Sequence, residues 1–242
     1  MQTIPSSPSE KPVSLWWRPD LVRLPALSWQ RRAFRGFIRL LCRCLMRICA
    51  EFQVSGLEHY PCQGPALLVI NHLGDADAVA VLAALPEFPE AIAKIELRSI
   101  ALLRWVMDGV GVIYVHRGRP DRRALAVALQ ALREGRKVIL APEGRQSLTG
   151  ALEQGTEGAA FLALKAGVPI IPIALTGTEN WRVYGNLKRL RRTHITVTVG
   201  VPFCLPDLGR GSQALKIGTQ YIMEALARLL PYEYRGEYAY VS

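Results

Sequence analysis

The chain contains one histidine whose neighbours suit it to act as a base. An apolar run ends in the stretch VINHLGDADAVA, residues 69–80, in which Asp77 follows His72 five positions later. A carboxylate that holds one imidazole nitrogen fixes the tautomer, and the other nitrogen can then take a proton from a hydroxyl. No serine or cysteine nucleophile stands beside this pair in the sequence, so the hydroxyl would belong to a substrate.

The local backbone has to bring these two side chains together. On a straight helix, residues five apart point about 140° away from each other, so His72 must lie in a loop. We expect Gly74 to permit a turn and Asp75 to cap a helix that begins at Ala76. Asp77 then lies in the first turn of that helix and reaches back to the imidazole. Two alternatives stay open: Asp75 as the partner of the histidine, and a core histidine that an aspartate caps.

Three further apolar runs end in residues of interest. The segment KVILAPEGRQS places a turn after such a run, where Gly144 allows exposed backbone N–H groups and Arg145 offers a planar donor fork that suits phosphate. The segment GVIYVHRGR delivers Arg117 to another strand end. We treat its neighbour His116 as structural, because alternation along the strand turns it to the opposite face. The segment AGVPIIPIALTG is a strand framed by Gly and Pro rather than a reactive element.

An α/β fold is expected to position these motifs. Apolar, β-branched runs recur after Gly56, and helical patterns separate several of them. The expected strands are ALLVI (66–70), GVIYV (111–115), KVILA (137–141), VPIIPIAL (168–175) and ITVTVG (195–200). The expected helices are RRALAVALQALREG (122–135), GAAFLALKAG (158–167) and a last one over about 211–230. We predict a mixed, largely parallel sheet flanked by helices, with the site at the carboxyl ends of its strands.

A basic amphipathic helix is predicted over residues 28–50, a segment without any acidic side chain. Its apolar residues at helical spacing are Phe34, Phe37, Ile38, Leu41, Leu45 and Ile48, and its arginines at every fourth position are Arg31, Arg35, Arg39, Arg43 and Arg47. We expect this helix to lie on an anionic membrane surface with its arginines on lipid phosphates. An ordinary surface helix is the alternative. The rest of the chain divides into an irregular tail over 1–27, a main domain over 51–230 and a C-terminal tail over 231–242.

Composition narrows the class of protein further. The net charge of +10 indicates a polyanionic partner, and the lack of a helix-turn-helix, zinc-finger or RNA-binding signature favours a membrane surface over nucleic acid. No apolar run approaches the length of about 18 residues that a spanning helix needs, and the first residues do not resemble a secretory signal. Five cysteines without disulfide or zinc spacing are expected to be free thiols. We expect no metal, no bound cofactor and a location at the cytoplasmic face of the membrane.

With its four motifs in this order, the chain resembles the glycerolipid acyltransferases of the lysophosphatidic acid (1-acyl-glycerol-3-phosphate) acyltransferase family. NHLGDAD looks like the His-x4-Asp block of that family, AKIELRSIALLRWVMDGVGVIYVHRGR like its arginine block, APEGRQS like its Pro-Glu-Gly block and AGVPIIPIALTG like its last block. The resemblance extends over about residues 56–200. It implies that His72 is the catalytic base and Asp77 its partner, and that Arg117, Glu143 and Gly144 form the acceptor-binding site.

The resemblance also implies a reaction. An acyl group would pass from a thioester of coenzyme A or acyl carrier protein to the hydroxyl of a lysophospholipid, in the first place 1-acyl-glycerol-3-phosphate, to give phosphatidic acid. The third block departs from the family pattern Phe-Pro-Glu-Gly-Thr-Arg, because Ala141, Arg145 and Gln146 replace its Phe, Thr and Arg. Either Arg145 takes over from the missing arginine, or the acceptor is glycerol 3-phosphate or another lysolipid. A non-catalytic lipid-binding protein is the rival class, and the lack of Gly-x-Ser-x-Gly disfavours a serine hydrolase.

Overall fold

The computed structural model describes residues 17–116 and 121–241. Within them a single sheet has seven strands in the order β1-β7-β6-β2-β5-β3-β4. These strands are β1 (Ala50–Ser55), β2 (Ala66–Ile70), β3 (Glu90–Lys94), β4 (Ile113–Val115), β5 (Lys137–Leu140), β6 (Ile170–Thr176) and β7 (Thr193–Val199). Neighbouring strands run parallel except β6 and β7, which are antiparallel. The predicted mixed, largely parallel sheet is confirmed.

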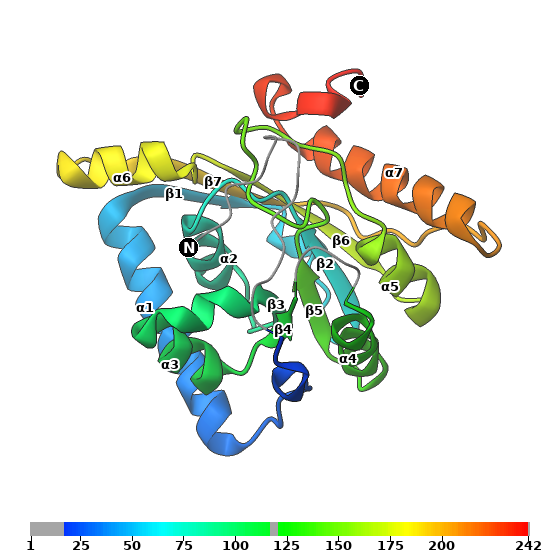
Figure 1. Ribbon diagram of the computed structural model, residues 1–242. Helices are drawn as coiled ribbons and strands as arrows, with labels where there is room; N and C mark the ends of the chain where they lie inside the picture. The colour runs from blue at the N-terminus through cyan, green and yellow to red at the C-terminus, as the bar shows by residue number, and fades with distance from the viewer. Residues whose placement is uncertain (1–16, 117–120, 242) are drawn as a thin grey trace.

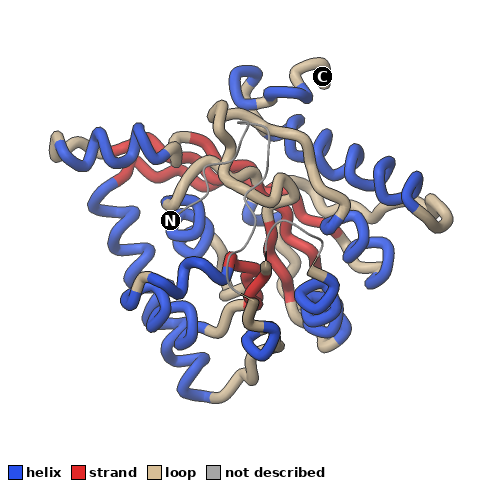
Figure 2. Tube along the Cα trace, in the orientation of Figure 1, coloured by secondary structure: helices blue, strands red, loops and turns tan. Residues whose placement is uncertain are grey.

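Helices cover both faces of this sheet (Figure 1, Figure 2). They are α1 (Trp29–Cys49), α2 (Ala76–Ala84), α3 (Ala101–Val110), α4 (Arg122–Arg133), α5 (Gly158–Ala166), α6 (Asn180–Lys188) and α7 (Ser212–Leu229). One buried cluster joins the sheet to α4, α5 and α7, and a second joins it to α1, α2 and α3. Helix α6 contacts β7 near the β1 end of the sheet.

The side chains of the central strand β2 alternate between the two buried clusters on either face of the sheet. Leu67 and Val69 belong to the cluster with α4, α5 and α7, whereas Ala66 and Leu68 belong to the cluster with α1, α2 and α3. Since helices cover both of its faces, a parallel strand in this position needs a continuous apolar run, and ALLVI supplies one. The carboxyl end of β2 leads directly into the candidate site.

Helix α1 packs on the domain by a mixed face, in which Arg35 is buried beside the apolar residues Ile38, Cys42 and Met46. Arg35 is buried, and its two terminal nitrogens pair with the Glu90 carboxylate at 3.0 and 2.7 Å. Three other arginines donate to backbone carbonyl oxygens in or near the last turns of α3 and α2: Arg31, Arg39 and Arg43. Such carbonyls lack intrahelical partners and carry partial negative charge, so they attract cations. The prediction of a contact with lipid phosphate is therefore wrong for Arg35, and for the other three arginines it stays a prediction.

The outward face of α1 is apolar. Phe37, Leu41, Leu45 and Ile48 are between 41% and 71% exposed and follow one another at helical spacing. The other two apolar residues of the predicted set face the protein: Ile38 is buried, and Phe34 packs edge-on against Trp105 of α3. We call the four exposed residues the apolar stripe of α1.

Four elements and parts of both tails were not predicted from the sequence. The elements are β1, β3, α3 and α6. In the N-terminal tail, Pro19–Leu21 form a short 3-10 helix and Val22 is buried in the core, so the expectation of an irregular tail is wrong there. The C-terminal tail packs through two short helices, η4 (Tyr232–Tyr234) and η5 (Gly236–Tyr238), with the side chains of Tyr234 and Tyr238 buried.

Candidate active site

The candidate site begins where β2 ends. Asn71 follows the strand, and its buried side chain bonds the backbone of Leu175 in β6: Nδ2 donates to the carbonyl at 2.9 Å and Oδ1 accepts the N–H at 2.7 Å. A side chain thus continues the pairing of β2 with β6, which fixes where the loop containing His72 starts. The sequence analysis did not single out Asn71. A polar residue directly after a buried strand is the signal that would have found it.

His72 and Asp77 are in direct contact. His72 Nδ1 lies 2.6 Å from Asp77 Oδ2, and the same oxygen accepts the backbone N–H groups of Leu73 at 2.7 Å and Gly74 at 3.0 Å. The side chain of Asp77 is 1% exposed and that of His72 is 29% exposed. A carboxylate at Nδ1 favours the tautomer that carries its proton there, which leaves Nε2 as an acceptor. No described residue hydrogen-bonds Nε2, so a substrate hydroxyl can approach it.

Asp75 is not the partner of the histidine. It stands at the N-cap position of α2, but its side chain makes no capping bond and accepts instead from Gln146 Nε2 at 2.7 Å and the Tyr184 hydroxyl at 2.9 Å. The expected cap by Asp75 is therefore wrong. The turn expected at Gly74 is present, since the Asp77 N–H donates to the Gly74 carbonyl at 3.3 Å. Gly74 also permits a close contact, because a Cβ there would lie 2.3 Å from the carbonyl oxygen of Thr178.

Glu143 links the histidine loop to the segment after the Pro-Glu-Gly turn. Its side chain is buried, and its two oxygens accept the backbone N–H groups of His72 at 2.9 Å and Glu153 at 3.0 Å. Burial raises the pKa of the Glu143 carboxyl to about 7, even though both N–H donors favour the charged form. A group predicted for the acceptor site thus lies directly behind His72 and holds the backbone of that residue.

The raised pKa of Glu143 makes the stability of the protein depend on pH. An unfolded glutamate ionises near pH 4.5 and the folded one near pH 7, so between these values the folded state binds more protons and stability falls as the pH rises. Glu143→Gln stays neutral throughout. Between about pH 5 and about pH 8 the wild type should lose up to about 3 kcal/mol relative to the variant. Urea unfolding of both proteins measures this, and a pH-independent difference would contradict it.

Arg145 forms an ion pair inside the site. Its Nε and Nη2 atoms donate to Glu153 Oε2 at 2.9 and 2.7 Å, and the two side chains are 13% and 14% exposed. Gly144 has a φ of 73°, in the left-handed region that favours glycine, and its N–H donates to the Ala141 carbonyl. The turn expected at Gly144 is present, but its own N–H is used within the turn. An acceptor phosphate would share Arg145 with Glu153.

Arg117 lies outside the described residues, so its place in the acceptor site stays a prediction. Its neighbour His116 forms a second pair of the same sequence spacing, with Nδ1 2.8 Å from Asp121 Oδ2. Here Nε2 accepts the backbone N–H of Arg18 at 3.0 Å, and the His116 side chain is 5% exposed. Both ring nitrogens are bonded within the protein, which confirms that His116 is structural. Spacing alone therefore does not distinguish a base from a packed histidine.

The described residues include no cluster of possible metal ligands and no helix that could cross a membrane. Across residues 17–116 and 121–241, no three His, Cys, Asp or Glu side chains gather closely enough to hold a metal ion. No helix in those same ranges combines the length and the apolar character needed to cross a membrane. The cysteines are free thiols, as predicted.

Comparison with known proteins identifies the family. Residues 51–176, just over half of the chain, match the protein family described as Acyltransferase. The chain belongs to this family. The resemblance inferred from the four sequence motifs is confirmed.

Several similar proteins bear the name 1-acyl-sn-glycerol-3-phosphate acyltransferase. The chain is 30% identical over 176 residues to the chloroplastic 1-acyl-sn-glycerol-3-phosphate acyltransferase of Arabidopsis thaliana, and 29% identical over 186 residues to the beta form in Homo sapiens. These matches cover 71% and 76% of this chain, but 49% and 62% of the relatives. A 1-acyl-sn-glycerol-3-phosphate acyltransferase of Borreliella burgdorferi is 30% identical over 149 residues, 57% of this chain and 59% of that protein. The chain thus spans about half to three-fifths of the length of these relatives.

A solved structure shares the fold. The crystal structure of the 1-acyl-sn-glycerophosphate acyltransferase PlsC from Thermotoga maritima superimposes with a TM-score of 0.63 at 23% identity, over 84% of this chain and 82% of that one. At this level of identity the similarity establishes the architecture. The predicted glycerolipid acyltransferase fold is confirmed.

Proposed function

We propose that the protein transfers a fatty acyl group from an acyl thioester to the hydroxyl of a lysophospholipid, with 1-acyl-glycerol-3-phosphate as the acceptor and phosphatidic acid as the product. The contact between His72 and Asp77 carries this proposal, because a buried carboxylate holds Nδ1 and leaves Nε2 to a substrate. Relatives that bear the name 1-acyl-sn-glycerol-3-phosphate acyltransferase support the choice of acceptor. The donor is a thioester of coenzyme A or of acyl carrier protein.

In the proposed reaction, His72 Nε2 takes the proton of the lysolipid hydroxyl while the hydroxyl oxygen attacks the thioester carbonyl carbon. Asp77 stabilises the imidazolium that forms. The tetrahedral intermediate then collapses as the carbon–sulfur bond breaks, and the imidazolium gives its proton to the leaving thiolate. One thioester is lost, one ester and one thiol are formed, and no acyl-enzyme is needed.

Four further residues are proposed to shape the acceptor side of the site. Arg117 and Arg145 would bind the acceptor phosphate, and Glu143 and Gly144 would hold the turn that presents it. Because Arg145 is paired with Glu153, an acceptor phosphate has to compete with the Glu153 carboxylate for this guanidinium. Such competition favours a doubly charged phosphate monoester over a zwitterionic headgroup, since the monoester interacts more strongly with the guanidinium.

Product analysis tests the proposed function. Purified protein is incubated with acyl-coenzyme A or with the acyl thioester of acyl carrier protein and, in turn, with 1-acyl-glycerol-3-phosphate, glycerol 3-phosphate and lysophosphatidylcholine, and products are identified by mass spectrometry. Phosphatidic acid is the expected main product. An acylated product from one of the other acceptors alone would assign the reaction to that acceptor, and no acylated product from any pair would overturn the proposal.

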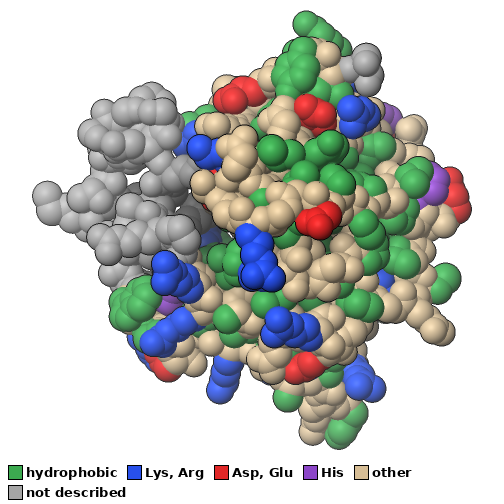
Figure 3. Space-filling model, turned by 90° about the vertical axis from the view of Figure 1, so that its right-hand side faces the viewer, with side chains coloured by type: hydrophobic (Ala, Val, Ile, Leu, Met, Phe, Trp, Pro, Cys, Tyr) green, Lys and Arg blue, Asp and Glu red, His purple; other side chains and the backbone are tan. Residues whose placement is uncertain are grey.

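We also propose that the protein lies at the membrane surface, with the apolar stripe of α1 in contact with lipid. Helices α3 and α6 lie on the same side of the molecule (Figure 1): Trp105 of α3 packs on α1, and Arg192 after α6 donates to the Arg47 carbonyl at the end of α1. Both helices add large exposed apolar residues, Leu102, Trp105, Trp181 and Leu187, and Leu190 follows shortly after α6. On the side of α7, by contrast, apolar and charged side chains are interspersed (Figure 3). The free thiols suit a reducing compartment and therefore the cytoplasmic face.

Leu41→Ser with Leu45→Ser should lower the partition of the protein onto anionic vesicles by about tenfold, because two apolar side chains are removed from the lipid contact. Both residues are partly exposed, at 44% and 41%, so the fold should be retained. Ile217→Ser with Tyr221→Ser on α7 is the matched control at the same spacing, with exposures of 37% and 46%. Vesicle sedimentation measures both. Equal binding of the two double variants would refute the proposed orientation.

A further inference from the structure

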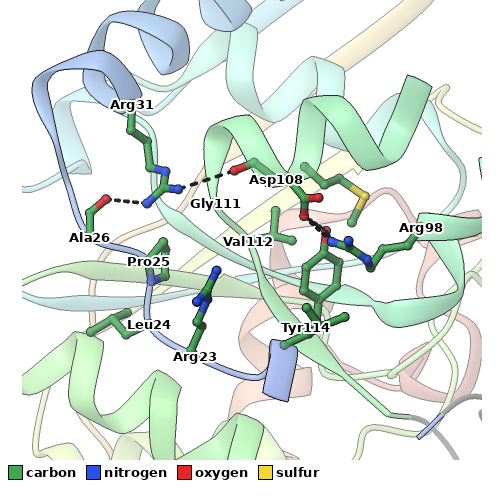
Figure 4. Close-up of a pocket in the computed structure, with 12 residues that line it drawn as sticks. Arg23, Leu24, Pro25, Ala26, Arg31, Arg98, Asp108, Gly111, Val112 and Tyr114 are labelled. Carbon is green, nitrogen blue, oxygen red and sulfur yellow. Dashed lines mark hydrogen bonds and ion pairs between the residues drawn. The ribbon is translucent and has the colours of Figure 1, made fainter. Parts of the chain in front are cut away.

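A groove beside the edge strand β4 carries an excess of arginine. Two neighbouring pockets of about 530 Å³ and 360 Å³ share Leu21 and Arg98 in their walls, and we call them together the groove. Residues 18–26 line one side, and α3 with the start of β4 lines the other (Figure 4). The charged residues of the two walls are Arg18, Arg23, Arg31, Arg98, Arg104 and Asp108.

The acids nearby do not balance these arginines: Asp20 pairs with Arg18, and Asp108 is the one acid in the walls described. Arg98 forms an ion pair with Asp108 and donates to the Tyr114 hydroxyl at 3.2 Å. Arg31 has only neutral acceptors, the backbone carbonyl oxygens of neighbouring residues. Arg31 therefore meets only the partial negative charge of backbone carbonyls, two of them at the end of α3, at the wall of the larger pocket, and no described carboxylate forms an ion pair with it.

Two more arginines add charge to the groove, although Arg23 lies within electrostatic range of Asp20. Arg23 and Arg104 are exposed, and neither side chain has a hydrogen bond or ion pair with any residue in the ranges 17–116 and 121–241. The side chain of Arg23 extends into the larger pocket between Pro25 and Tyr114 (Figure 4). Concave walls with several unmatched positive charges raise the local concentration of anions, and a pocket of this volume suits a nucleotide-sized ligand.

The sheet register places this groove relative to His72. Leu68, Ile139 and Ala91 lie in one row across β2, β5 and β3. His72 follows the end of β2 by two residues and Ile95 follows the end of β3 directly, and Ile95 lines the smaller pocket. Two strand spacings separate them, which is about 10 Å. The larger pocket lies one strand further out and towards the opposite ends of the strands, on the order of 20 Å from His72 by the same spacings.

We propose that this groove binds the phosphate-bearing end of coenzyme A, so that the acyl donor is acyl-coenzyme A. The inference rests on the proposed acyl transfer. In coenzyme A, an arm with two amide groups separates the sulfur from the diphosphate, and such a chain extends on the order of 15 Å. The sulfur can thus reach His72 while the diphosphate meets Arg98 and Arg104. The adenosine with its 3′-phosphate then occupies the larger pocket beside Arg23 and Arg31.

Neither the acceptor phosphate nor a carrier protein fits this groove as well. In 1-acyl-glycerol-3-phosphate, only two carbons and one ester oxygen separate the reacting hydroxyl from the phosphorus. A phosphate in the larger pocket would therefore leave that hydroxyl far from His72. A carrier protein binds through a surface, whereas the arginines here surround a hollow of nucleotide size.

Calorimetry with coenzyme A and dephospho-coenzyme A as probes tests the proposal on the full chain. Arg23→Gln and Arg104→Gln should each raise the Kd for coenzyme A about tenfold, because each loses one charged contact to phosphate. Arg228→Gln, an exposed arginine on α7, is the control and should leave the Kd unchanged. Dephospho-coenzyme A should bind the wild type more weakly than coenzyme A does. The Arg23→Gln variant should leave the Kd for dephospho-coenzyme A unchanged. In steady-state assays the two groove variants should raise the KM for acyl-coenzyme A and leave the KM for the lysolipid unchanged.

Three outcomes would overturn the proposal: no binding of coenzyme A to the wild type, an unchanged Kd in both groove variants, or a raised KM for the lysolipid in place of the donor. Acyl transfer from the acyl thioester of acyl carrier protein, together with no binding of coenzyme A, would contradict the groove proposal and support the proposed acyl transfer. Conversely, binding of coenzyme A that depends on Arg23, without acyl transfer to any acceptor, would contradict the proposed function and support the groove as a coenzyme A site.

Discussion

His72→Ala should lower kcat by about 10²- to 10⁴-fold while the protein stays folded. The imidazole is partly exposed at a loop, so its removal opens no cavity in the core, but the lysolipid hydroxyl loses the group that takes its proton. The carboxylate of Asp77 keeps the N–H groups of Leu73 and Gly74 in the variant, which preserves the loop. Steady-state assays, with a thermal melt followed by circular dichroism, measure activity and fold together.

The chain contains its own matched control for this prediction. His116 is also bonded to an aspartate five residues later, but its Nε2 accepts from the backbone and its side chain is buried. His116→Ala should therefore lower the melting temperature and leave kcat close to that of the wild type. If His72→Ala kept most of its turnover, or if both variants lost activity equally, His72 would not be the base.

Glu90→Ala should destabilise the protein by about 3 to 5 kcal/mol, because it leaves the guanidinium of Arg35 buried without a counter-charge. The two side chains are 2% and 7% exposed, and the pair joins α1 to β3. Arg136 also reaches Glu90, at 3.4 Å, so the variant loses a second ionic contact. Urea unfolding gives the free energy of unfolding for each protein.

A double variant separates the cost of an unpaired charge from the loss of packing. In Arg35→Met with Glu90→Leu both charges are gone, and apolar side chains fill similar volumes, so most of the lost stability should return. A loss below about 1 kcal/mol in Glu90→Ala would show that Arg35 finds other acceptors, such as the Val110 carbonyl that it already contacts at 2.7 Å. A double variant no more stable than Glu90→Ala would show that the pair contributes through specific geometry.

Local pattern was sufficient to predict the pair at the centre of the site. His72 follows a buried strand, and only a loop followed by a helix allows Asp77 to reach it, which is the arrangement observed. The choice between Asp75 and Asp77 could not be made from the sequence. It depends on Gln146 and Tyr184, which lie far along the chain and bind Asp75.

The orientation of α1 and the pairing of Arg145 required the tertiary structure. The sequence of α1 contains both an apolar stripe and a row of arginines, and either face can in principle pack inward. The face that packs inward buries Ile38, Cys42 and Met46, and the backbone carbonyls at the ends of α2 and α3, together with the buried Glu90, bind the arginines beside them. Arg145 meets Glu153 because the turn at Gly144 folds the chain back on itself. Strands β1 and β3 are short segments with charged residues, AEFQVS and EAIAK, and their apolar signal is correspondingly weak.

Thiol release after rapid mixing of the protein with acyl-coenzyme A, with and without 1-acyl-glycerol-3-phosphate, tests most directly whether His72 activates the acceptor hydroxyl for direct transfer. We predict no thiol release before the acceptor is added and, after its addition, one molecule of phosphatidic acid for each thiol released. A burst of thiol equal to the amount of protein, in the absence of acceptor, would indicate an acyl-enzyme and contradict direct transfer. If no thiol is released with the acceptor present, either from acyl-coenzyme A or from the acyl thioester of acyl carrier protein, acyl transfer itself is contradicted.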